Sequence, residues 1–403
     1  MPVSSLVKYN LEIGENNYLY LVQTHYDYSI LGAGLSGLTV ALRMSRDPFF
    51  ASKRIAIIDQ DLNKGNDRTW CFWETEADMY ETIISHKWPQ VLVKGKGVDQ
   101  TITITPYSYK KIESSDLYAF SKNELSKYSN ITFIQGSVKD IIEDKKSVRI
   151  VLEDTTFTAS HVLNSIYKPQ LLEKQKQKVV LQQHFIGWFV STKEAVFTPE
   201  VATYMDFSVA QKGNCRFMYV LPTSETEALL EYTLFSQNLL PKTAYEEAIK
   251  EYLHKLGVTN YTITAREQGS IPMTTYDFTQ HNSARILHIG TAGGWTKAST
   301  GYTFKHTIKR SKKLIAFLKS GEVFTHYTLK NKWTFYDSVL LEVLAAHNHR
   351  GAEIFTGMFK KGKADYIFRF LDEESSFWDE LKVIWSAPKG IFIKAAMRVI
   401  FGR

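Results

Sequence analysis

The sequence has 403 residues, of which 44% are hydrophobic and 23% charged, a balance that indicates a folded protein rather than a disordered one. Two cysteines, Cys71 and Cys215, are too few for a disulfide framework and indicate a reducing compartment. Neither has another Cys or a His at metal-ligand spacing, so we expect no metal site. The net charge of +7 is modest, and we expect no nucleic-acid partner.

The amino-terminal segment, residues 1–25, shows no strong hydrophobic period and is interpreted as an extension. It lacks a basic region followed by an apolar core and a cleavage site, so we expect no secretory signal peptide. No stretch of the chain is apolar for long enough to predict a membrane-spanning helix.

A dinucleotide-binding fingerprint begins at Tyr26. The β-rich run Tyr26–Leu31 stops at a glycine turn, and a helical run, Leu38–Ser45, follows it. A second apolar run, Ile55–Ile58, ends at Asp59. This order of strand, glycine turn, helix, strand and acid predicts a Rossmann-type unit. A glycine-rich turn without a ligand is the alternative for the glycines alone.

The glycines of this turn have separate expected roles. Gly32 permits the tight turn, Gly34 lets the backbone approach a pyrophosphate, and Gly37 lets the helix pack closely on the strand. The helix amino terminus offers free N–H groups to the phosphates, and Asp59 can accept hydrogen bonds from a ribose. The fingerprint does not separate FAD from NAD(P), because both carry adenosine diphosphate.

The middle of the chain changes from parallel-type to antiparallel-type strands. Short strands are predicted at Ile131–Gln135, Val148–Leu152 and His161–Ser165, and an antiparallel group at Leu181–Val190, Cys215–Leu221 and Ala228–Phe235. Helices are predicted at Tyr245–Leu256 and Thr303–Lys319. We therefore expect an α/β fold in three parts: a discontinuous nucleotide-binding domain (26–180 and 262–320), an interleaved antiparallel substrate sheet (181–261) and a helical carboxy-terminal region (321–403).

A second glycine-rich stretch follows the strand-like run Arg285–Gly290. Gly290, Thr291 and Gly293 open a loop that contains Gly301 and ends at the next predicted helix. An ordinary strand–loop–helix connection is the alternative. Two glycine loops far apart in sequence favour FAD, since a flavin needs contacts at its adenosine and isoalloxazine ends.

Four segments carry a resemblance to a known family. In chain order they are Asp-Arg-Thr-Trp-Cys-Phe-Trp-Glu (67–74), Gln-Gln-His-Phe-Ile-Gly-Trp (182–188), Ile-Pro-Met (271–273) and Gly-Thr-Ala-Gly (290–293). Their ordered combination, spread over roughly Tyr26 to Lys394, resembles lycopene β-cyclases of the bacterial and plant type.

The resemblance implies a fold like that of flavoprotein monooxygenases and non-covalent FAD. It also implies closure of β-ionone rings on an acyclic carotenoid, lycopene, without net redox change, so that NAD(P)H would only keep the flavin reduced. Arg68 is then expected at a flavin phosphate or ribityl group. Thr291 stands where many flavoproteins carry an aspartate, a feature that the resembled cyclases share.

Ring closure needs an acid that is protonated near neutral pH, and Glu231 is the main candidate. On a strand, Glu231 shares one face with Leu229, Thr233 and Phe235, where poor solvation should raise its pKa. The segment resembles the family's Phe-Leu-Glu-Glu-Thr motif, with Tyr232 in place of the second glutamate. An edge-strand glutamate facing water is the alternative.

Glu74 and Glu267 are secondary candidates for the acid or base. Glu74 ends an aromatic cluster that contains Trp70, Phe72 and Trp73, whose rings could face a carbocation or simply form core. Glu267 lies just before the Ile-Pro-Met segment. For each of the two acids, a structural ion pair is the competing interpretation.

The carboxy-terminal tail from Pro388 to Arg403 is basic and apolar. Lys394 and Arg398 lie four residues apart on one helical face, and most other positions are apolar. This pattern is typical of an interfacial helix on an anionic membrane, although a terminal helix packed on the domain would look similar. We expect a peripheral protein on the cytoplasmic side of the membrane, where an insoluble carotenoid can be collected.

Two other functions fit the same pattern. One is an FAD- and NAD(P)H-dependent oxidoreductase of the same fold, a hydroxylase or prenyl reductase acting on an isoprenoid lipid. The other is a non-catalytic flavin-binding protein at membranes. Stoichiometry separates them, because only the oxidoreductase consumes reductant in proportion to product.

Overall fold

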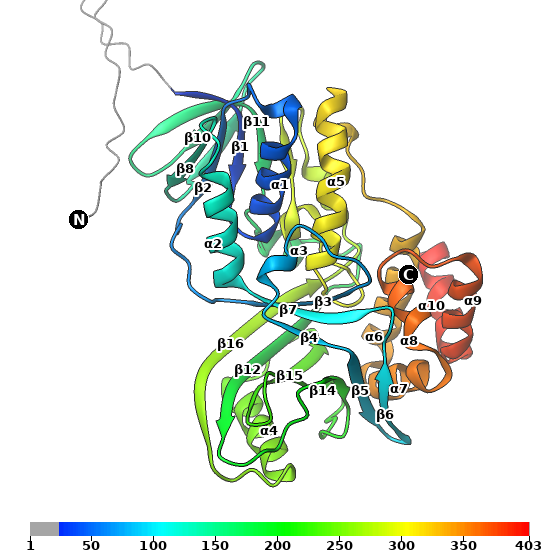
Figure 1. Cartoon of the computed structure of the whole chain (residues 1–403). Coiled ribbons are helices and arrows are strands. Elements are labelled where there is room, and N and C mark those ends of the chain that lie inside the picture. Colours follow the sequence, from blue (N-terminus) through cyan, green and yellow to red (C-terminus); the bar gives the residue numbers. More distant parts are fainter. Residues whose placement is uncertain (1–23, 403) are drawn as a thin grey trace, which may run out of the picture.

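The computed structural model describes residues 24–402, so the expected extension 1–25 lies almost wholly outside the described residues. One mixed sheet and its helices form the upper part of the molecule in Figure 1, a second sheet lies below it, and carboxy-terminal helices lie beside the second sheet. This arrangement confirms the α/β fold expected from the sequence.

The first sheet has seven strands in the order β8-β2-β1-β11-β10-β9, with β17 also paired to β11. The strands β8, β2, β1, β11 and β17 are parallel to one another, whereas β10 pairs antiparallel with β11 and β9 antiparallel with β10. Their bounds are β1 His25–Leu31, β2 Ile55–Asp59, β8 Ile131–Gln135, β9 Asp140–Glu143, β10 Val148–Val151, β11 Thr156–Asn164 and β17 Ile286–His288.

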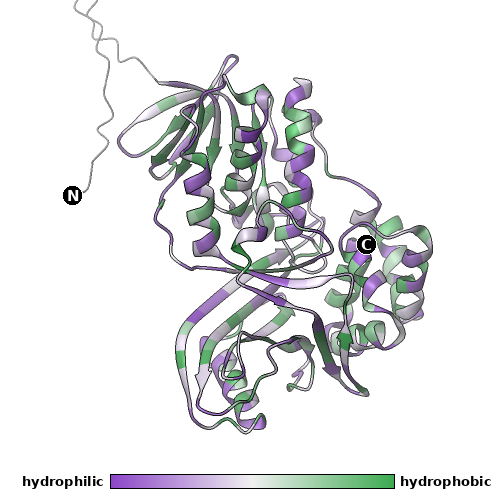
Figure 2. Cartoon of the chain, in the orientation of Figure 1, coloured by the Kyte–Doolittle hydropathy of each residue, from purple (hydrophilic) through white to green (hydrophobic). Residues whose placement is uncertain are grey.

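Both faces of this sheet are covered, because helices pack on one face and residues of the antiparallel extension pack on the other, and its central strands are therefore continuous apolar runs. All five residues of β2 are buried, as a parallel strand covered on both faces requires. The covering helices are α1 (Leu35–Arg46), α2 (Ser114–Leu125) and α5 (Phe304–Ser320), seen side by side in Figure 1. Figure 2 shows the hydrophobic colouring concentrated on these inner strands.

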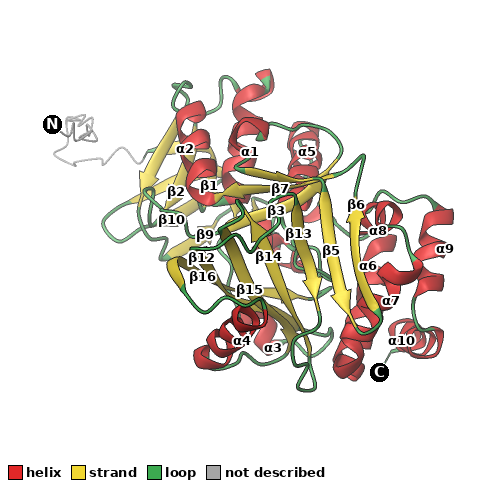
Figure 3. Cartoon of the chain, turned by 60° about the horizontal axis from the view of Figure 1, so that its bottom comes forward, coloured by secondary structure: helices red, strands yellow, loops and turns green. Residues whose placement is uncertain are grey.

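The second sheet has seven strands in the order β16-β12-β15-β14-β13-β5-β6. All neighbours are antiparallel except β13 and β5. The bounds are β5 Gln90–Gly95, β6 Val98–Thr103, β12 Leu181–Thr192, β13 Val201–Asp206, β14 Cys215–Pro222, β15 Glu227–Ser236 and β16 Tyr261–Met273. Helix α4 (Lys242–Lys255) covers one face, as Figure 3 shows.

This sheet takes in more of the chain than the expected segment 181–261. Strand β16 pairs with β12 from Tyr261 to Met273, although residues from 262 onward were expected with the nucleotide domain. Strands β5 and β6 join the opposite edge. Most of β16 is polar and partly exposed, so it carries no hydrophobic alternation from which its partner sheet could be predicted.

A small third sheet, in the order β3-β7-β4, links the two larger ones. It consists of β3 (Thr69–Glu74), β4 (His86–Trp88) and β7 (Ser108–Glu113), and the short helix α3 (Gln170–Lys174) precedes β12. The carboxy-terminal helices pack against the face of the second sheet opposite α4. They are α6 Lys332–His347, α7 Gly351–Lys361, α8 Ala364–Leu371, α9 Phe377–Ser386 and α10 Lys389–Phe401.

Candidate active site

A cavity of about 490 Å³ lies where the second sheet, β3, the second glycine loop and the carboxy-terminal helices meet. Its walls are largely aromatic and aliphatic, and three carboxylic acids also line it: Glu231, Glu267 and Asp337, of which Asp337 is paired with Lys297. The cavity brings together the main sequence candidate and one of the two secondary candidates. A mostly apolar pocket with a few convergent polar groups is the usual form of a small-molecule site.

Strand register places the two acids in one row across the sheet. Gly187 of β12 pairs with Glu231 on β15 and with Glu267 on β16. Tyr219 of β14 continues the row on the far side of Glu231. A Cβ at Gly187 would lie 2.9 Å from Leu229 Cδ1 and 3.1 Å from Glu267 Cγ. The missing side chain therefore provides the space in which the two glutamates meet.

The predicted strand alternation at Glu231 is confirmed. Leu229 and Phe235 line the cavity on the same face as Glu231, and Thr233 Oγ1 donates a 2.6 Å hydrogen bond to Glu231 Oε1. Residues at the alternate positions, among them Leu230 and Tyr232, pack on the α4 side. Glu231 is thus a pocket residue and not a water-facing edge glutamate.

Burial and a like charge raise the pKa of Glu231. Loss of solvent is the larger cause, followed by the negative charge of Glu267 and a hydrogen bond between the two carboxyl groups. Burial also raises the pKa of Glu267, but Glu267 accepts a 2.7 Å hydrogen bond from Thr69 Oγ1 and feels Lys111 and Arg68. The shared proton therefore belongs on Glu231.

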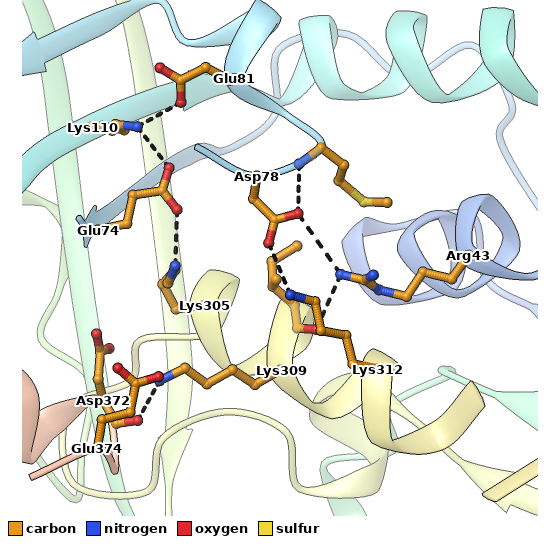
Figure 4. Close-up of polar contacts among 12 residues, drawn as sticks. Arg43, Glu74, Asp78, Glu81, Lys110, Lys305, Lys309, Lys312, Asp372 and Glu374 are labelled. Carbon is orange, nitrogen blue, oxygen red and sulfur yellow. Dashed lines mark hydrogen bonds and ion pairs between the residues drawn. The ribbon is translucent and has the colours of Figure 1, made fainter. Parts of the chain in front are cut away.

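The third candidate acid, Glu74, lies outside the cavity lining, in a network of ion pairs (Figure 4). Its Oε1 is 2.8 Å from Lys110 Nζ and its Oε2 is 2.9 Å from Lys305 Nζ. Lys110 also pairs with Glu81 at 2.6 Å. The structural ion pair considered for Glu74 is therefore present, whereas Glu267 makes no ion pair within 24–402 and faces the cavity.

The first glycine loop has the geometry that a dinucleotide needs. A Cβ at Gly37 would lie 2.0 Å from Gly32 O, so helix and strand are in the expected close contact. Gly34 caps α1, and a Cβ there would meet nothing within 4 Å. The space over the helix amino terminus is open to a phosphate.

Asp59 ties the end of β2 to this loop. Its Oδ2 accepts hydrogen bonds of 2.6 Å from both Ala33 N and Lys64 Nζ. The carboxylate thereby fixes the glycine turn beside the expected ribose position. Arg68 is exposed and lies at the start of β3, and its charge acts on Glu267.

The second glycine loop packs directly on the first. Gly290 has a φ of +61°, and a Cβ there would lie 2.7 Å from Ser36 Oγ. Gly293 comes so close to its preceding strand that a Cβ would lie 2.1 Å from His288 O. Thr291 Oγ1 is 3.3 Å from Thr296 Oγ1 within the loop. Two loops more than 250 residues apart thus form one cradle.

Where this loop reaches the cavity, two buried oxygen atoms lack a hydrogen-bond partner in the described part of the chain. They are Gln183 Oε1 and Thr300 Oγ1, and both residues line the cavity. A Cβ at Gly301 would lie 2.1 Å from Gln183 Oε1, so the glycine leaves room for that amide. Buried polar groups are rarely left unpaired, so these atoms fit a bound polar ring system.

Sequence reasoning missed several cavity residues. Tyr219 could have been found, because it pairs with Glu231 once β14 and β15 are aligned as a hairpin. Gln183 and Cys71 lie in segments that carry the family resemblance, but nothing in those segments assigns them to the cavity, and Thr300 carries no local signal. Of the aromatic cluster, Trp70 lines the cavity, whereas Phe72 and Trp73 are buried in core clusters.

The carboxy-terminal helices α9 and α10 leave large hydrophobic side chains exposed beside the cavity. Trp385 is 63% exposed and Ile393 is 58% exposed, and both also line the cavity. The tail packs on the domain as one of its two expected alternatives requires, with Ala395 buried in a cluster with Val339 of α6, while Ile400 and others face outward. In residues 24–402, no helix meets the length and hydropathy needed to cross a bilayer.

The family model for lycopene cyclase protein matches residues 27–397. The chain belongs to the lycopene cyclase family. A curated lycopene beta-cyclase of Pantoea ananas is 25% identical over 335 residues, which cover 78% of this chain and 79% of that protein. The family-model match over residues 27–397 includes both glycine loops, the residues that line the cavity and most of α10.

Solved flavoproteins share the fold of this family member. A flavoprotein/dehydrogenase from Cytophaga hutchinsonii superposes with a TM-score of 0.62 at 10% identity, covering 94% of this chain and 100% of the other. A geranylgeranyl bacteriochlorophyll reductase-like protein from Thermoplasma acidophilum gives 0.59 at 10% identity, covering 93% and 99%. The flavoprotein-monooxygenase-like fold is therefore shared, as expected.

Proposed function

We propose that this lycopene cyclase family member is a lycopene β-cyclase, which closes β-ionone rings at the ends of lycopene to give γ-carotene and β-carotene. The observation that carries the proposal is the carboxyl group of Glu231 inside a large apolar cavity, where burial and the neighbouring Glu267 raise its pKa. A hydrocarbon polyene offers no polar handle, so a site for it must combine apolar walls with an acid strong enough to act on a double bond.

The reaction balances without a redox step. The Glu231 proton adds to the terminal double bond of the polyene and leaves a tertiary cation. An internal double bond attacks that cation, which forms the new carbon–carbon bond and moves the charge onto the ring. Loss of a ring proton to a base then forms the ring double bond, so the product is an isomer of the substrate.

The cavity protects these cations from water. Aromatic side chains on several elements face the interior, among them Trp70, Tyr219 and Tyr302. The faces of such rings attract positive charge without reacting with it. Because the walls exclude water, the cation is not captured as an alcohol before the ring closes.

FAD is the cofactor that the two loops fit. Gly32, Gly34 and Gly37 would hold the pyrophosphate at the amino terminus of α1, while Gln183 and Thr300 would meet the isoalloxazine ring. When bound and kept reduced by NAD(P)H, the flavin would supply an electron-rich ring to the site. Gly34→Val tests this directly, since its side chain meets open space in the protein. The variant should fold but lose non-covalent FAD, and a full flavin complement would contradict the placement.

A docking surface on α9 and α10 supports a peripheral position on the cytoplasmic face of a membrane. Its exposed apolar side chains are Phe377, Trp378, Ile384, Trp385, Ile393, Met397, Ile400 and Phe401. Lysine and arginine side chains of the same helices surround them, at Lys382, Lys389, Lys394 and Arg398. This combination is typical of binding to anionic lipid. Since Trp385 and Ile393 also line the cavity, a carotenoid could pass from the bilayer into it.

Point substitutions test the docking surface better than truncation, because α10 packs on α6 and lines the cavity. Trp385→Glu and Ile400→Glu should weaken co-sedimentation with anionic phospholipid vesicles. The matched control is Leu239→Glu, at a residue that is 60% exposed elsewhere on the molecule. Equal binding by all three variants would place the membrane contact on another surface.

The proposed reaction is tested with purified protein, FAD, NADPH and lycopene in anionic vesicles under anaerobic conditions. Chromatography should reveal cyclic carotenoids of unchanged mass. NADPH oxidation should not rise in proportion to product. A reduced or hydroxylated carotenoid formed with stoichiometric NADPH would instead establish an oxidoreductase, and unchanged lycopene would leave only flavin binding.

A further inference from the structure

The cavity holds a second acid whose surroundings differ from those of Glu231. The carboxylate of Glu267 accepts a hydrogen bond from Thr69 Oγ1 and lies in the field of two cations, Lys111 and Arg68. Glu231 has a hydroxyl partner, Thr233, but no ion pair in the part of the chain that the structure describes. The environment thus separates the pair into one proton donor and one proton acceptor.

Tyr232, which stands at the second acid of the family motif, cannot share this work. Strand alternation turns Tyr232 to the opposite face of the sheet, where it packs among the residues under α4. Its hydroxyl accepts a 3.3 Å hydrogen bond from Arg216. The second carboxyl group of the cavity therefore comes from β16, two strands away from β15, across Gly187.

We propose that Glu267 is the catalytic base that removes the ring proton in the cyclisation proposed above. This role of Glu267 rests on the proposed cyclase function. After the ring closes, the cyclic cation gives one proton to the Glu267 carboxylate, and the carbon–hydrogen electron pair becomes the ring double bond. Glu231, which lost its proton at the start, recovers one from Glu267 through their shared hydrogen bond, so both groups return to their initial states.

The position of the base then decides which double bond forms. A cyclic tertiary cation can lose a proton from any adjacent carbon, and each choice gives a different ring isomer. A single fixed carboxylate at one edge of the ring selects one of these protons. Glu267 is fixed by Thr69 from one side and by the strand pairing of β16 with β12 from the other.

The experiment compares Glu267→Gln with the wild type, using pigment chromatography to resolve ring isomers and measuring the rate against pH. We expect the rate to fall by ~10²-fold or more, as is typical when a general base is removed. The residual product should be a mixture of ring isomers. The alkaline limit of the rate should move to lower pH, because Glu231 loses the negative neighbour that helps to raise its pKa.

Other groups also act on the two acids and must stay in place for this comparison. They are Cys71, Tyr219 and Tyr302 around Glu231, and Lys111 and Arg68 around Glu267. None of them is changed by the variants. Glu267→Asp is the second variant, and it should retain the wild-type isomer at a reduced rate even if Glu267→Gln folds poorly.

Position 232 provides the matched control. Tyr232→Phe should leave the rate and the isomer unchanged, and Tyr232→Glu should not rescue Glu267→Gln, because its carboxyl group would face α4. The proposal is overturned if folded Glu267→Gln gives a single ring isomer at the wild-type rate, or if Tyr232→Glu restores activity. Absence of cyclic product from the wild-type protein would instead refute the proposed function.

Discussion

Glu231 and Glu74 are both withdrawn from water, yet they have opposite surroundings. The carboxylate of Glu74 is held by two lysines, and a second acid, Glu81, shares one of them (Figure 4). Glu231 faces an apolar cavity beside another acid, Glu267, and within residues 24–402 its only close donor besides that acid is a threonine hydroxyl. Glu231 lines the cavity, whereas Glu74 lies outside the cavity lining, at the end of β3.

The comparison shows that burial alone does not make an acid reactive. Burial disfavours the charged form of an acid, whereas a nearby lysine favours it. Where the neighbour is another carboxyl group, the two effects add and a proton is retained. The proposed role of the cavity acid therefore depends on its lack of a paired cation, while the ion-paired acid connects β3 to β7 and to α5.

The largest effect is expected at the cavity acid. Glu231→Gln keeps the shape and the hydrogen bond from Thr233 but carries no acidic proton. Cyclisation should fall by at least the ~10²–10⁴-fold that general acid catalysis contributes. Flavin content should stay close to that of the wild type, and so should thermal unfolding at low pH, where the wild-type acid is uncharged in both the folded and the unfolded state. Turnover near the wild-type rate, with flavin bound, would transfer the role to a different acid.

A smaller effect on a different property is expected at the ion-paired acid. Glu74→Gln leaves Lys305 with a weaker partner, while Lys110 retains Glu81. The free energy of unfolding should fall by about 3 kcal/mol, the lower end of the range for breaking a buried ion pair. Denaturant titration measures this loss. Activity per folded, flavin-loaded molecule should change little. A loss of activity without a loss of stability would contradict the structural role of Glu74.

Much of the nucleotide-binding fold was predictable from the sequence because its signals are local. The run from Tyr26 to Asp59 carries its strand, turn and helix signals within a few residues, and the structure confirms each of them. Strand β8 has the predicted bounds, Ile131–Gln135. Strand β16 could not be assigned to its sheet, since its partner β12 precedes it by about 80 residues and its own pattern is polar.

The candidate site was predictable only in part for the same reason. The strand period around Glu231 placed that residue on an apolar face, and the structure confirms the placement. The meeting of Glu231 with Glu267 depends on register across three strands and on the absence of a side chain at Gly187. Neither feature can be predicted from a local sequence pattern. Local patterns therefore left Glu74 and Glu267 with equal standing as secondary candidates.

The smallest expected effect is on the pH dependence of stability. It contrasts the cavity acid Glu231 with Glu81, an acid of the ion-pair network. The pKa of Glu231 is higher in the folded protein than its ordinary value, so its contribution to stability is complete at low pH and is lost as pH rises through the folded-state pKa. The pKa of Glu81 is lowered by Lys110 and Lys87, so its contribution is present above the ordinary value and is lost as pH falls. Thermal unfolding between about pH 2 and pH 9 should show both limbs. Glu231→Gln should flatten the alkaline limb and leave the acid limb as it is, whereas equal alkaline slopes in the two proteins would mean that Glu231 is already ionised in the fold.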